Sequence, residues 1–569
     1  MKIKLLGVPA IVDGSGQEQT VRGHQAWALL ARLLMSKSPL SRRTLAAELF
    51  PGTVDPLGSL RWCLAALRKA LGSAEFLRGD PIALVPMEGA EVDVYRLGSD
   101  EFDVETAGPL LEGVDPQCSP EYSTWLLVER ERVASVIDAR VRQAAQQAIA
   151  VGNIERAIRL AELGVHRAPF DEGLHILLVK GLTLAGRFEA ACQHVDATHT
   201  MFQTELGQVP SAALRSAARR TLSSPPSGVS PRAVIESLLE SGLSALSAGA
   251  VDAGVDCLRR AATNAEHGAD LRLQASTLMA LGTALIHSVR GHDDEGAILL
   301  RQAIERAQRC GDAGLAATGY RELGYVEALA GRRPTAAEHL TLALDLSTDD
   351  DERAGVHGVM GFNLVDWGRV DEGLAHYHQS LEHARRADNR RRQAWSLGLG
   401  GWGLLAADRT DEADQWLTDC IQLVDELRWT AFRPWPCALF GETRLRQAVD
   451  PVVIQADLEN AFALSCQLGD PCWEAAVART LGLSCEVLGD LDRGMSWFTE
   501  ARRRCVRETD SYVALLVEIL VDQARVSAKQ GQSAQSDACT REALSLAARA
   551  HMDGHVSRAV ELLQSSAPA

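Results

Sequence analysis

The beginning of the chain alternates hydrophobic and polar positions over two short stretches, residues 3–6 and 10–12. A period of two is typical of a half-buried β-strand. The polar, glycine-rich residues 13–16 that follow the second stretch indicate a turn. We therefore expect a small β-hairpin before the first helix.

Three helical patterns come next. The first is an apolar stripe at helical spacing, made by Trp27, Leu30, Leu33 and Leu34. Ser41 is a suitable N-cap for a second helix at residues 42–49. Residues 51–56, with a proline at either end, break the chain before a third helix that ends at Gly72.

The third helix has two different faces. At about 100° per residue, four leucines share a narrow arc that we expect to face the core: Leu60, Leu64, Leu67 and Leu71. Arg61 and Arg68 flank this stripe, and the opposite face consists of Gly58, Trp62, Ala65, Ala66 and Lys69. Small side chains with basic margins suit a DNA major groove, but a merely solvated face has the same pattern. This helix alone leaves both possibilities open.

A second hairpin is predicted after Gly72. Residues 76–78 and 82–85 are expected to be strands, joined by the turn at residues 79–81. A hairpin in this place is the wing of a winged helix. Arg78, near its tip, is positioned to reach an adjacent DNA backbone or minor groove.

Composition and charge narrow the classes of protein. With 569 residues, of which 46% are hydrophobic, 5% aromatic and 23% charged, the chain is neither disordered nor a large β-sandwich. Its net charge is -17, yet residues 1–90 contain 11 Lys and Arg against 7 Asp and Glu. Because the acidic remainder repels phosphate, we expect any contact with nucleic acid to be confined to the first domain.

Turn residues recur along the rest of the chain. Gly152, Ala157 and Pro169 have the spacing of a tetratricopeptide repeat, and Gly186 and Ala190 follow about 34 residues later. Beyond residue 232, glycines recur at intervals of 37 to 42 residues: Gly242, Gly282, Gly324, Gly361, Gly400, Gly441 and Gly482. Many are followed by a turn residue seven positions later and a small residue five beyond that, as with Gly249 and Gly254, Gly331 and Ala336, Gly368 and Gly373, and Gly489 and Gly494.

These intervals predict eight helical hairpins in a right-handed solenoid, with the last unit, around Ala524 and Gly531, as a cap. Eight of the 11 tryptophans lie between Trp367 and Trp497. They leave two alternatives, an aromatic ligand groove or ordinary packing between helices, and we favour packing.

Motifs for catalysis and for cofactor or metal binding are missing from the sequence. It has no GxxxxGK[ST], HExxH, GxSxG or CxxC, so we expect no enzyme, no cofactor, no metal site and reduced, mostly buried cysteines. His376, His378 and His383 are interpreted as a solvated helix face. No apolar run is long enough to span a bilayer, and Pro9 interrupts the only stretch like a signal peptide, which favours the cytoplasm.

Two regions resemble a known family. The runs GHQAWALLARLLMSKSPLSRRTLAAELFPG, SLRWCLAALRKALG and FLRGDPIALVP resemble the winged-helix domain of SARP-type transcriptional activators, which is similar to response-regulator effector domains. The runs GPLLEGVDPQCSPEYSTWLLVERERV, VGNIERAIRLAELGVHRAPFDEGLHILLVKGLTLAGRFEAACQHV and TELGQVPSAALR resemble the bacterial transcriptional activator domain that follows it in that family. The paired order covers about residues 1–220, and no ATPase domain follows.

The expected fold is mainly α, with an α+β winged helix-turn-helix, an all-α tetratricopeptide-like domain and an α-solenoid of helical hairpins. The expected parts are residues 1–95, 96–222, a linker at 223–232, and 233–569. The resemblance implies phosphate contacts by Ser41, Arg42 and Arg43, and a recognition helix presenting Arg61, Trp62, Ala65, Arg68 and Lys69. Two positions depart from the family: many members have arginine where this chain has Ala66, and a polar residue where it has Trp62.

The resemblance also implies the partners. The third helix enters promoter DNA at direct repeats, the middle domain pairs protomers and touches RNA polymerase, and the array senses a small-molecule or protein effector, without a membrane. The alternative is a tetratricopeptide interaction scaffold whose winged helix has lost DNA binding.

Overall fold

The computed structural model describes residues 1–36, 38–72, 77–84, 90–99, 102–218, 232–247, 250–289, 291–507 and 512–565. The chain divides into two compact units, Met1–Arg140 and Val141–Ala569. The division falls inside one long helix, α4 (Pro120–Ala150). Most of the expected linker, residues 223–231, lies outside the described residues, and the four-part division of the chain stays a prediction.

The first unit contains a small sheet at the chain start. It has the strand order β3-β2-β1-β6, from β1 (Lys2–Lys4), β2 (Ala10–Val12), β3 (Glu18–Gln19) and β6 (Glu91–Val92). A short 3₁₀ helix, Asp93–Tyr95, follows β6. Strand β1 is antiparallel to β2 and parallel to β6, so Ile3 pairs with both Ile11 and Val92. The predicted hairpin is therefore present, and β3 and β6, which were not anticipated, extend it.

Three helices and a wing follow in the expected order. They are α1 (His24–Met35), α2 (Arg42–Leu49), α3 (Pro56–Ala70), β4 (Leu77–Arg78) and β5 (Ala83–Leu84). Strands β4 and β5 pair antiparallel. Ser41 caps α2 as predicted, because its hydroxyl accepts a hydrogen bond from the backbone N–H of Thr44. Phe76 and Val85, at the outer ends of the expected wing strands, are among the residues that are not described.

The core of the first unit is built from the predicted leucines. The stripe of α1 and all four leucines of the α3 stripe are buried. The beginning of α4 packs against the same helices, since the Tyr122 hydroxyl donates to the carbonyl of Ala28 at 2.9 Å. Arg32 donates to Glu48 at 2.9 Å and lies 4.7 Å from the Trp125 ring centroid. These contacts fix the helices from which α3 projects its outer face.

The second unit begins with the end of α4 and four shorter helices, α5 (Ile154–Arg167), α6 (Glu172–Leu184), α7 (Phe188–Leu206) and α8 (Ala212–Ala217). Gly152 and Gly186 have φ of 79° and 76°, the left-handed conformation that ends a helix. Ala157 is buried on α5 as expected, but Ala190 is exposed. The buried residue is its neighbour Ala191, which follows Gly186 at the same distance in sequence as Ala157 follows Gly152.

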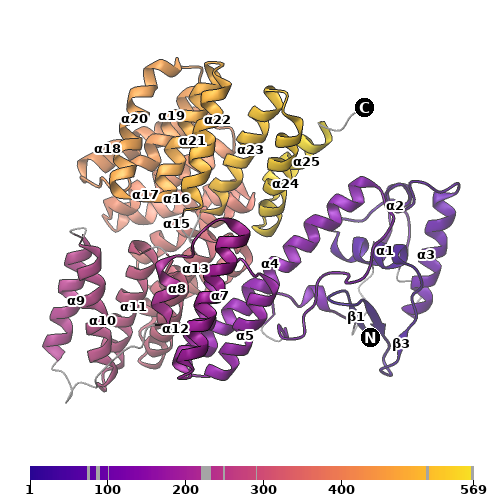
Figure 1. Ribbon diagram of the computed structural model, residues 1–569, viewed down its shortest axis with the longest axis horizontal. Helices are drawn as coiled ribbons and strands as arrows, with labels where there is room; N and C mark the ends of the chain where they lie inside the picture. Colours follow the sequence, from indigo (N-terminus) through magenta and orange to yellow (C-terminus); the bar gives the residue numbers. More distant parts are fainter. Residues whose placement is uncertain are drawn as a thin grey trace. The chain divides into compact units, whose positions relative to one another are not determined.

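From residue 232 onward, the described residues form eight helical hairpins and one single helix (Figure 1). The hairpins are α9 (Arg232–Ser247) with α10 (Val251–Glu266), α11 (Leu271–Ser288) with α12 (Asp293–Arg309), α13 (Ala313–Leu329) with α14 (Arg333–Leu346), α15 (Asp350–Trp367) with α16 (Val370–Arg386), α17 (Arg390–Ala406) with α18 (Thr410–Glu426), α19 (Pro434–Arg446) with α20 (Pro451–Leu468), α21 (Pro471–Val487) with α22 (Leu491–Cys505), and α23 (Val513–Lys529) with α24 (Ser533–Arg549). The single helix is α25 (Asp553–Ser565), so the eighth hairpin is not the last element.

The repeating glycines explain the close pairing within these hairpins. Each of the seven lies in the first helix of its pair. A Cβ on Gly361 would come within 3.0 Å of the Tyr377 ring on the partner helix, a distance that real Cβ atoms rarely show. Gly331, Gly368 and Gly489 have positive φ and end first helices as predicted, whereas Gly249 lies outside the described residues. The spacing of the glycines therefore corresponds to the spacing of the helix pairs along the chain.

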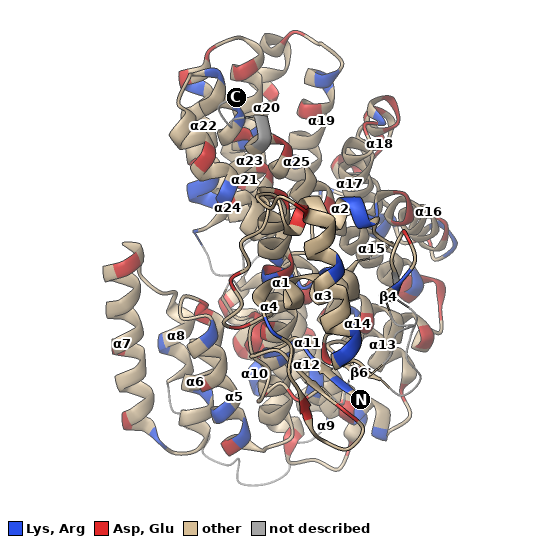
Figure 2. Cartoon of the chain, turned by 90° about the vertical axis from the view of Figure 1, so that its right-hand side faces the viewer, with Lys and Arg blue, Asp and Glu red and all other residues tan. Residues whose placement is uncertain are grey.

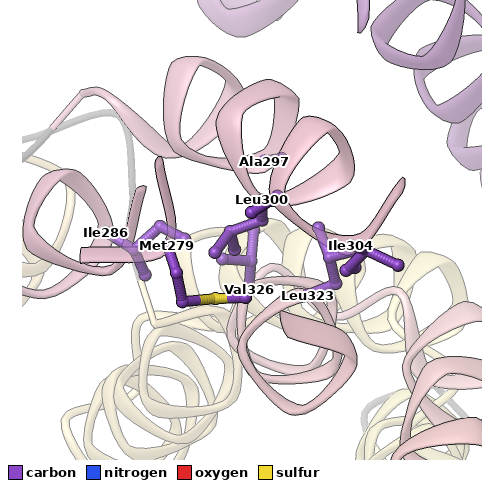
Figure 3. Close-up of a cluster of buried hydrophobic side chains, with 8 residues drawn as sticks. Met279, Ile286, Ala297, Leu300, Ile304, Leu323 and Val326 are labelled. Carbon is purple, nitrogen blue, oxygen red and sulfur yellow. The ribbon is translucent and has the colours of Figure 1, made fainter. Parts of the chain in front are cut away.

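Hydrophobic residues stack each hairpin on the next. In Figure 3, Met279 of α11, Leu300 of α12 and Val326 of α13 belong to one buried cluster. Each hairpin covers part of its apolar surface only with its neighbour, as expected of a repeat array. The fold is mainly α, as predicted. Within the described ranges, none of the helices combines the length and apolarity needed to cross a bilayer.

A buried polar network joins the end of α4 to the array inside the second unit. Arg142 makes ion pairs with Asp171 and with Asp294 of α12, and Arg142 and Asp294 are both buried. Gln146 donates to the same Asp294 at 2.6 Å and accepts from Arg301 at 3.3 Å. A buried charge is stable only with such partners. Helices α4 and α12 are therefore held together although more than 140 residues separate them.

Candidate nucleic-acid interface

Helix α3 presents the two faces that its sequence predicts. The leucine stripe is 0 to 2% exposed, whereas Trp62 is 62% exposed. Ala65 and Lys69 are also exposed, and Ala66 is half-buried. Figure 2 shows the basic residues of the chain in blue, those of α3 among them. The outer face therefore combines small residues, one aromatic ring and a cationic margin.

Arg61 lies on this margin with weak partners. Its Nε donates to the carbonyl of Leu57 at 3.2 Å, and its Nη2 is 3.7 Å from the carboxylate of Asp55, the N-cap of α3. The side chains of both members of the ion pair are about two-thirds exposed. An exposed pair of this kind contributes little, so the guanidinium is available to exchange its carboxylate partner for a phosphate.

Arg42 and Arg68 tie the wing to the helices. Arg42 donates through Nε to the carbonyl of Gly79 at 2.9 Å, and its backbone N–H donates to Asp80. Arg68 donates to the carbonyl of Leu77. Arg42, a predicted phosphate contact, and Arg68, a predicted recognition-helix residue, thus both donate hydrogen bonds to the wing. The sequence did not reveal this role because the acceptors are backbone carbonyls.

The same arginines form a local concentration of positive charge with Arg78. Partial burial, followed by repulsion from Arg42 and Arg78, lowers the pKa of the Arg68 guanidinium. Arginine nevertheless keeps its charge at neutral pH. Three cations therefore converge where the wing meets α2 and α3, and such a cluster attracts a polyanion.

The remaining predicted residues lie at the start of α2. The Ser41 hydroxyl is used as the helix cap, and it also lies 2.8 Å from the Thr44 hydroxyl. Arg43 is exposed. The backbone N–H groups of Arg42 and Thr44 at this helix start are already bonded to Asp80 and Ser41, so the exposed Arg43 side chain is the group here that suits a phosphate. The structure thus brings every predicted residue to α2, α3 or the wing.

Trp62 also borders an open hollow of about 610 Å³, which is lined by residues including Arg22, Phe50 and Gly58. Two exposed aliphatic residues, Val54 and Leu57, lie on the same loop and helix start. The sequence did not predict this apolar patch. It gives Trp62 two neighbouring surfaces, the hollow and the outer face of α3.

The tryptophans of the array are packed between hairpins. Trp402 and Trp435 are buried, with ring centroids 5.8 Å apart, and Trp435 lies 5.1 Å from Trp473. Because these rings contact one another across successive first helices, they form interhelical packing, the alternative that the sequence favoured.

The interpretation as a solvated helix face is right for His378, which is exposed, and wrong for His376 and His383, which are half-buried. His376 does not project into solvent, because its Nδ1 lies 2.8 Å from Nδ1 of His357 on the neighbouring helix. His383 bonds to Asp350 at 2.6 Å, and the His378 ring packs edge-on against Trp416. Helix periodicity alone could not show that this face meets α15 and α18.

The described part of the chain holds no group of three or more His, Cys, Asp or Glu suited to a metal ion. The 12 cysteines are free, and six of them are buried, so burial is less general than the sequence suggested.

Residues 106–222 match the family model of the bacterial transcriptional activator domain. A comparison with curated proteins found no match. Among solved structures, the chain is similar to aspartyl phosphate phosphatase F from Bacillus subtilis, with 11% identity, 72% of this chain and 94% of that chain covered, and a TM-score of 0.39. For the apo form of the quorum sensor NprR from B. thuringiensis the values are 14%, 64%, 98% and 0.39.

Another similar structure is Mycobacterium tuberculosis EmbR in complex with a low affinity phosphopeptide, with 20% identity, 38% of this chain and 63% of that chain covered, and a TM-score of 0.31. The match at residues 106–222 covers the segment in which the second set of family-like runs was found. Residues 106–222 therefore carry a bacterial transcriptional activator domain, and an array of helical hairpins follows it in the chain.

Proposed function

We propose that the chain is a transcriptional regulator, acting as an activator, that binds promoter DNA through α3 and the wing of its first unit. The observation that carries this proposal is the outer face of α3, where Trp62 and Lys69 are exposed while the leucine stripe is buried. The bacterial transcriptional activator domain that follows supports it.

In this proposal α3 enters the major groove. Ala65 allows close approach, and Arg61 and Lys69 contact phosphates or guanine edges. Trp62 packs against bases, and Arg78 on the wing reaches the adjacent backbone or minor groove. Ser41, Arg42 and Arg43 contact phosphate at the start of α2, and Arg68 adds charge to their cluster.

The other parts of the chain have their own proposed roles. The middle domain pairs protomers and contacts RNA polymerase, and the array responds to an effector. The protein acts in the cytoplasm. The acidic remainder of the chain, which makes the net charge -17, orients DNA toward the first unit by repulsion.

A mobility-shift titration of the full chain tests the proposal. Fragments of the chain's own promoter region are titrated at several salt concentrations. Affinity should fall by about 0.9 log units per log unit of salt for each phosphate that is neutralised. Arg61→Ala should weaken binding, whereas Arg503→Ala, an exposed arginine of the array paired with Glu500, should not. Equal affinities of the two variants would exclude α3 as the interface.

The alternative function is an interaction scaffold whose winged helix docks protein. Two observations favour it: Arg42 and Arg68 already donate to wing carbonyls, and no cation stands at Ala66. If no genomic fragment shifts with the full chain at low salt, the scaffold is the better description.

A further inference from the structure

The array lines a partly open cavity of about 770 Å³, which we call the array chamber. Most of its walls come from five successive first helices, α15, α17, α19, α21 and α23, and from the single helix α25. Cavities of roughly 300 to 1,000 Å³ are typical of sites for small ligands. The chamber is therefore large enough for such a ligand.

The chamber has an additional wall because the end of the array packs against its middle. The Tyr512 hydroxyl, just before α23, donates to Asp366 of α15 at 2.9 Å. The turn after α15 meets the start of α25, since a Cβ on Gly368 would lie 3.2 Å from the backbone nitrogen of Gly554. The Trp367 and His551 rings are 6.2 Å apart. Helix α25 thus supplies a wall that consecutive hairpins alone would leave open.

The deep part of the chamber is charged but internally neutralised. Arg479 donates to Asp522 at 2.7 Å, to Glu442 at 2.7 Å and to Glu518 at 3.0 Å. Each carboxylate also has a second donor: Arg525 for Asp522, Arg446 for Glu442 and His555 for Glu518. These groups hold one another and leave no strong charge for a ligand.

Two cations of the lining keep unused donors. Arg558 of α25 is exposed. Among the described residues none accepts a hydrogen bond from it or forms an ion pair with it, and its charge acts on the Glu518 carboxylate only at longer range. Lys529 donates to Glu486 at 2.8 Å, which uses one of its three N–H groups. The chamber therefore offers donors to an anionic group at the side formed by α23 and α25.

The rest of the lining limits the shape and charge of the ligand. Five aliphatic side chains from α15, α17, α19 and α21 line the other side: Val365, Leu405, Leu445, Leu483 and Val487. They favour an apolar body. Glu486 already neutralises part of the charge on Lys529, so the two cations balance a monoanion better than a dianion. A carboxylate fits these limits better than a phosphate.

We propose that the array chamber binds a small monocarboxylate with an apolar body, whose carboxylate is held by Arg558 and Lys529. That this ligand is the effector of the array rests on the proposed regulatory function, whereas the binding itself does not. The carboxylate belongs either to a free aliphatic acid or to the C-terminus of a short apolar peptide.

Isothermal titration calorimetry of the full chain without DNA tests the site. The probes are decanoate, decan-1-ol and decyl phosphate, which have apolar tails of nearly equal length, and N-acetyl-leucyl-leucine and its C-terminal amide. All are used at concentrations at which they are dissolved as monomers. Decanoate should bind at least about tenfold more tightly than decanol and decyl phosphate. If the peptide acid binds more tightly than both decanoate and the peptide amide, the carboxylate belongs to a peptide. If decanoate binds more tightly than the peptide acid, it belongs to a free aliphatic acid.

Variants locate the binding. Arg558→Gln and Lys529→Gln should each weaken binding of the carboxylate that binds more tightly by about tenfold. The control Arg503→Gln should leave its affinity unchanged. Both substitutions are at exposed positions, and unchanged melting curves will show that the variants fold. The proposal is overturned if neither carboxylate binds, if decanol or decyl phosphate binds as tightly as decanoate, or if both variants bind as the parent does. Ligand binding in a chain that shifts no DNA would reject only the proposed function.

Discussion

The two units use arginine in opposite ways. On α3 of the first unit, Arg61 is exposed and has one distant carboxylate partner. In the second unit, Arg479 is buried among three carboxylates within 3.0 Å. In the first unit the arginine therefore keeps donors that can bind another molecule. In the second unit its donors are used by carboxylates of the same chain.

This difference separates a binding surface from a structural cluster. A buried ion cluster gains little over apolar packing while it is complete, but it becomes costly when one member is removed. An exposed arginine contributes almost nothing to folding, so its presence on a face of small residues calls for another explanation. The DNA contact that we propose for α3 is such an explanation.

The largest expected effect is on Arg479. Arg479→Leu leaves Glu442, Glu518 and Asp522 buried together without their shared cation, and should lower the free energy of unfolding by about 3 to 5 kcal/mol. Chemical denaturation followed by circular dichroism measures this loss. If the loss is no larger than that of a surface variant such as Arg503→Leu, the buried carboxylates do not depend on Arg479 for stability.

The next effect depends on pH and concerns His357. Burial, followed by repulsion from His376, His383 and Arg353, lowers the pKa of His357 to about 4. The unfolded histidine binds its proton near pH 6.5, so the stabilisation is complete above pH 6.5 and is lost as the pH falls toward 4. Stability should decrease by up to about 1.4 kcal/mol per pH unit from this group.

The matched variant is His357→Asn. Its unfolding free energy, subtracted from that of the parent at each pH, should isolate this dependence from that of the acidic residues. Identical slopes of the two proteins between pH 6.5 and 4.5 would mean that His357 can be protonated in the folded chain.

A smaller effect is expected for Trp62, which is 62% exposed. Trp62→Ala should reduce discrimination between the chain's own site and a site with altered bases by about 1 to 3 kcal/mol, because an apolar base contact is lost. The slope of affinity against salt should change little, since no phosphate contact is removed. Competition binding with the two duplexes measures both quantities, and a changed slope with unchanged preference would assign Trp62 to the backbone.

The smallest effect is that of Arg61→Ala on folding. Its exposed pair with Asp55 predicts a change below about 1 kcal/mol in the free energy of unfolding. Thermal melting and denaturation should give nearly the parent values while DNA binding weakens. If Arg61→Ala strongly destabilised the folded chain, Arg61 would be a structural residue like Arg479, and the difference between the two units would not hold.

Periodic features of the fold were predictable from the sequence. Leu60, Leu64 and Leu67 repeat with the helical period, and all three are buried. The glycines repeat with the hairpin period because each marks a close helix pair, as Gly361 does against Tyr377. The exposed position of Trp62 followed from the same helical geometry.

Contacts across distant segments were not predictable in this way. The carbonyls that receive Arg42 and Arg68 belong to the wing backbone, which carries no side-chain pattern. The Arg479 cluster does have a signal in the sequence, because its partners lie 37, 39 and 43 residues from Arg479, which is about one repeat. Charged residues on first helices at the repeat period are the pattern that could have revealed it.

Photocrosslinking from Trp62 tests the central claim most directly. In the full chain, Trp62 is replaced by p-benzoylphenylalanine, and Tyr95, a comparably exposed aromatic residue of the same unit, is replaced likewise as the control. Irradiation with promoter duplex should give a protein–DNA adduct from position 62 and little from position 95. Adducts with protein alone from position 62, or equal DNA adducts from both positions, would contradict DNA recognition by α3.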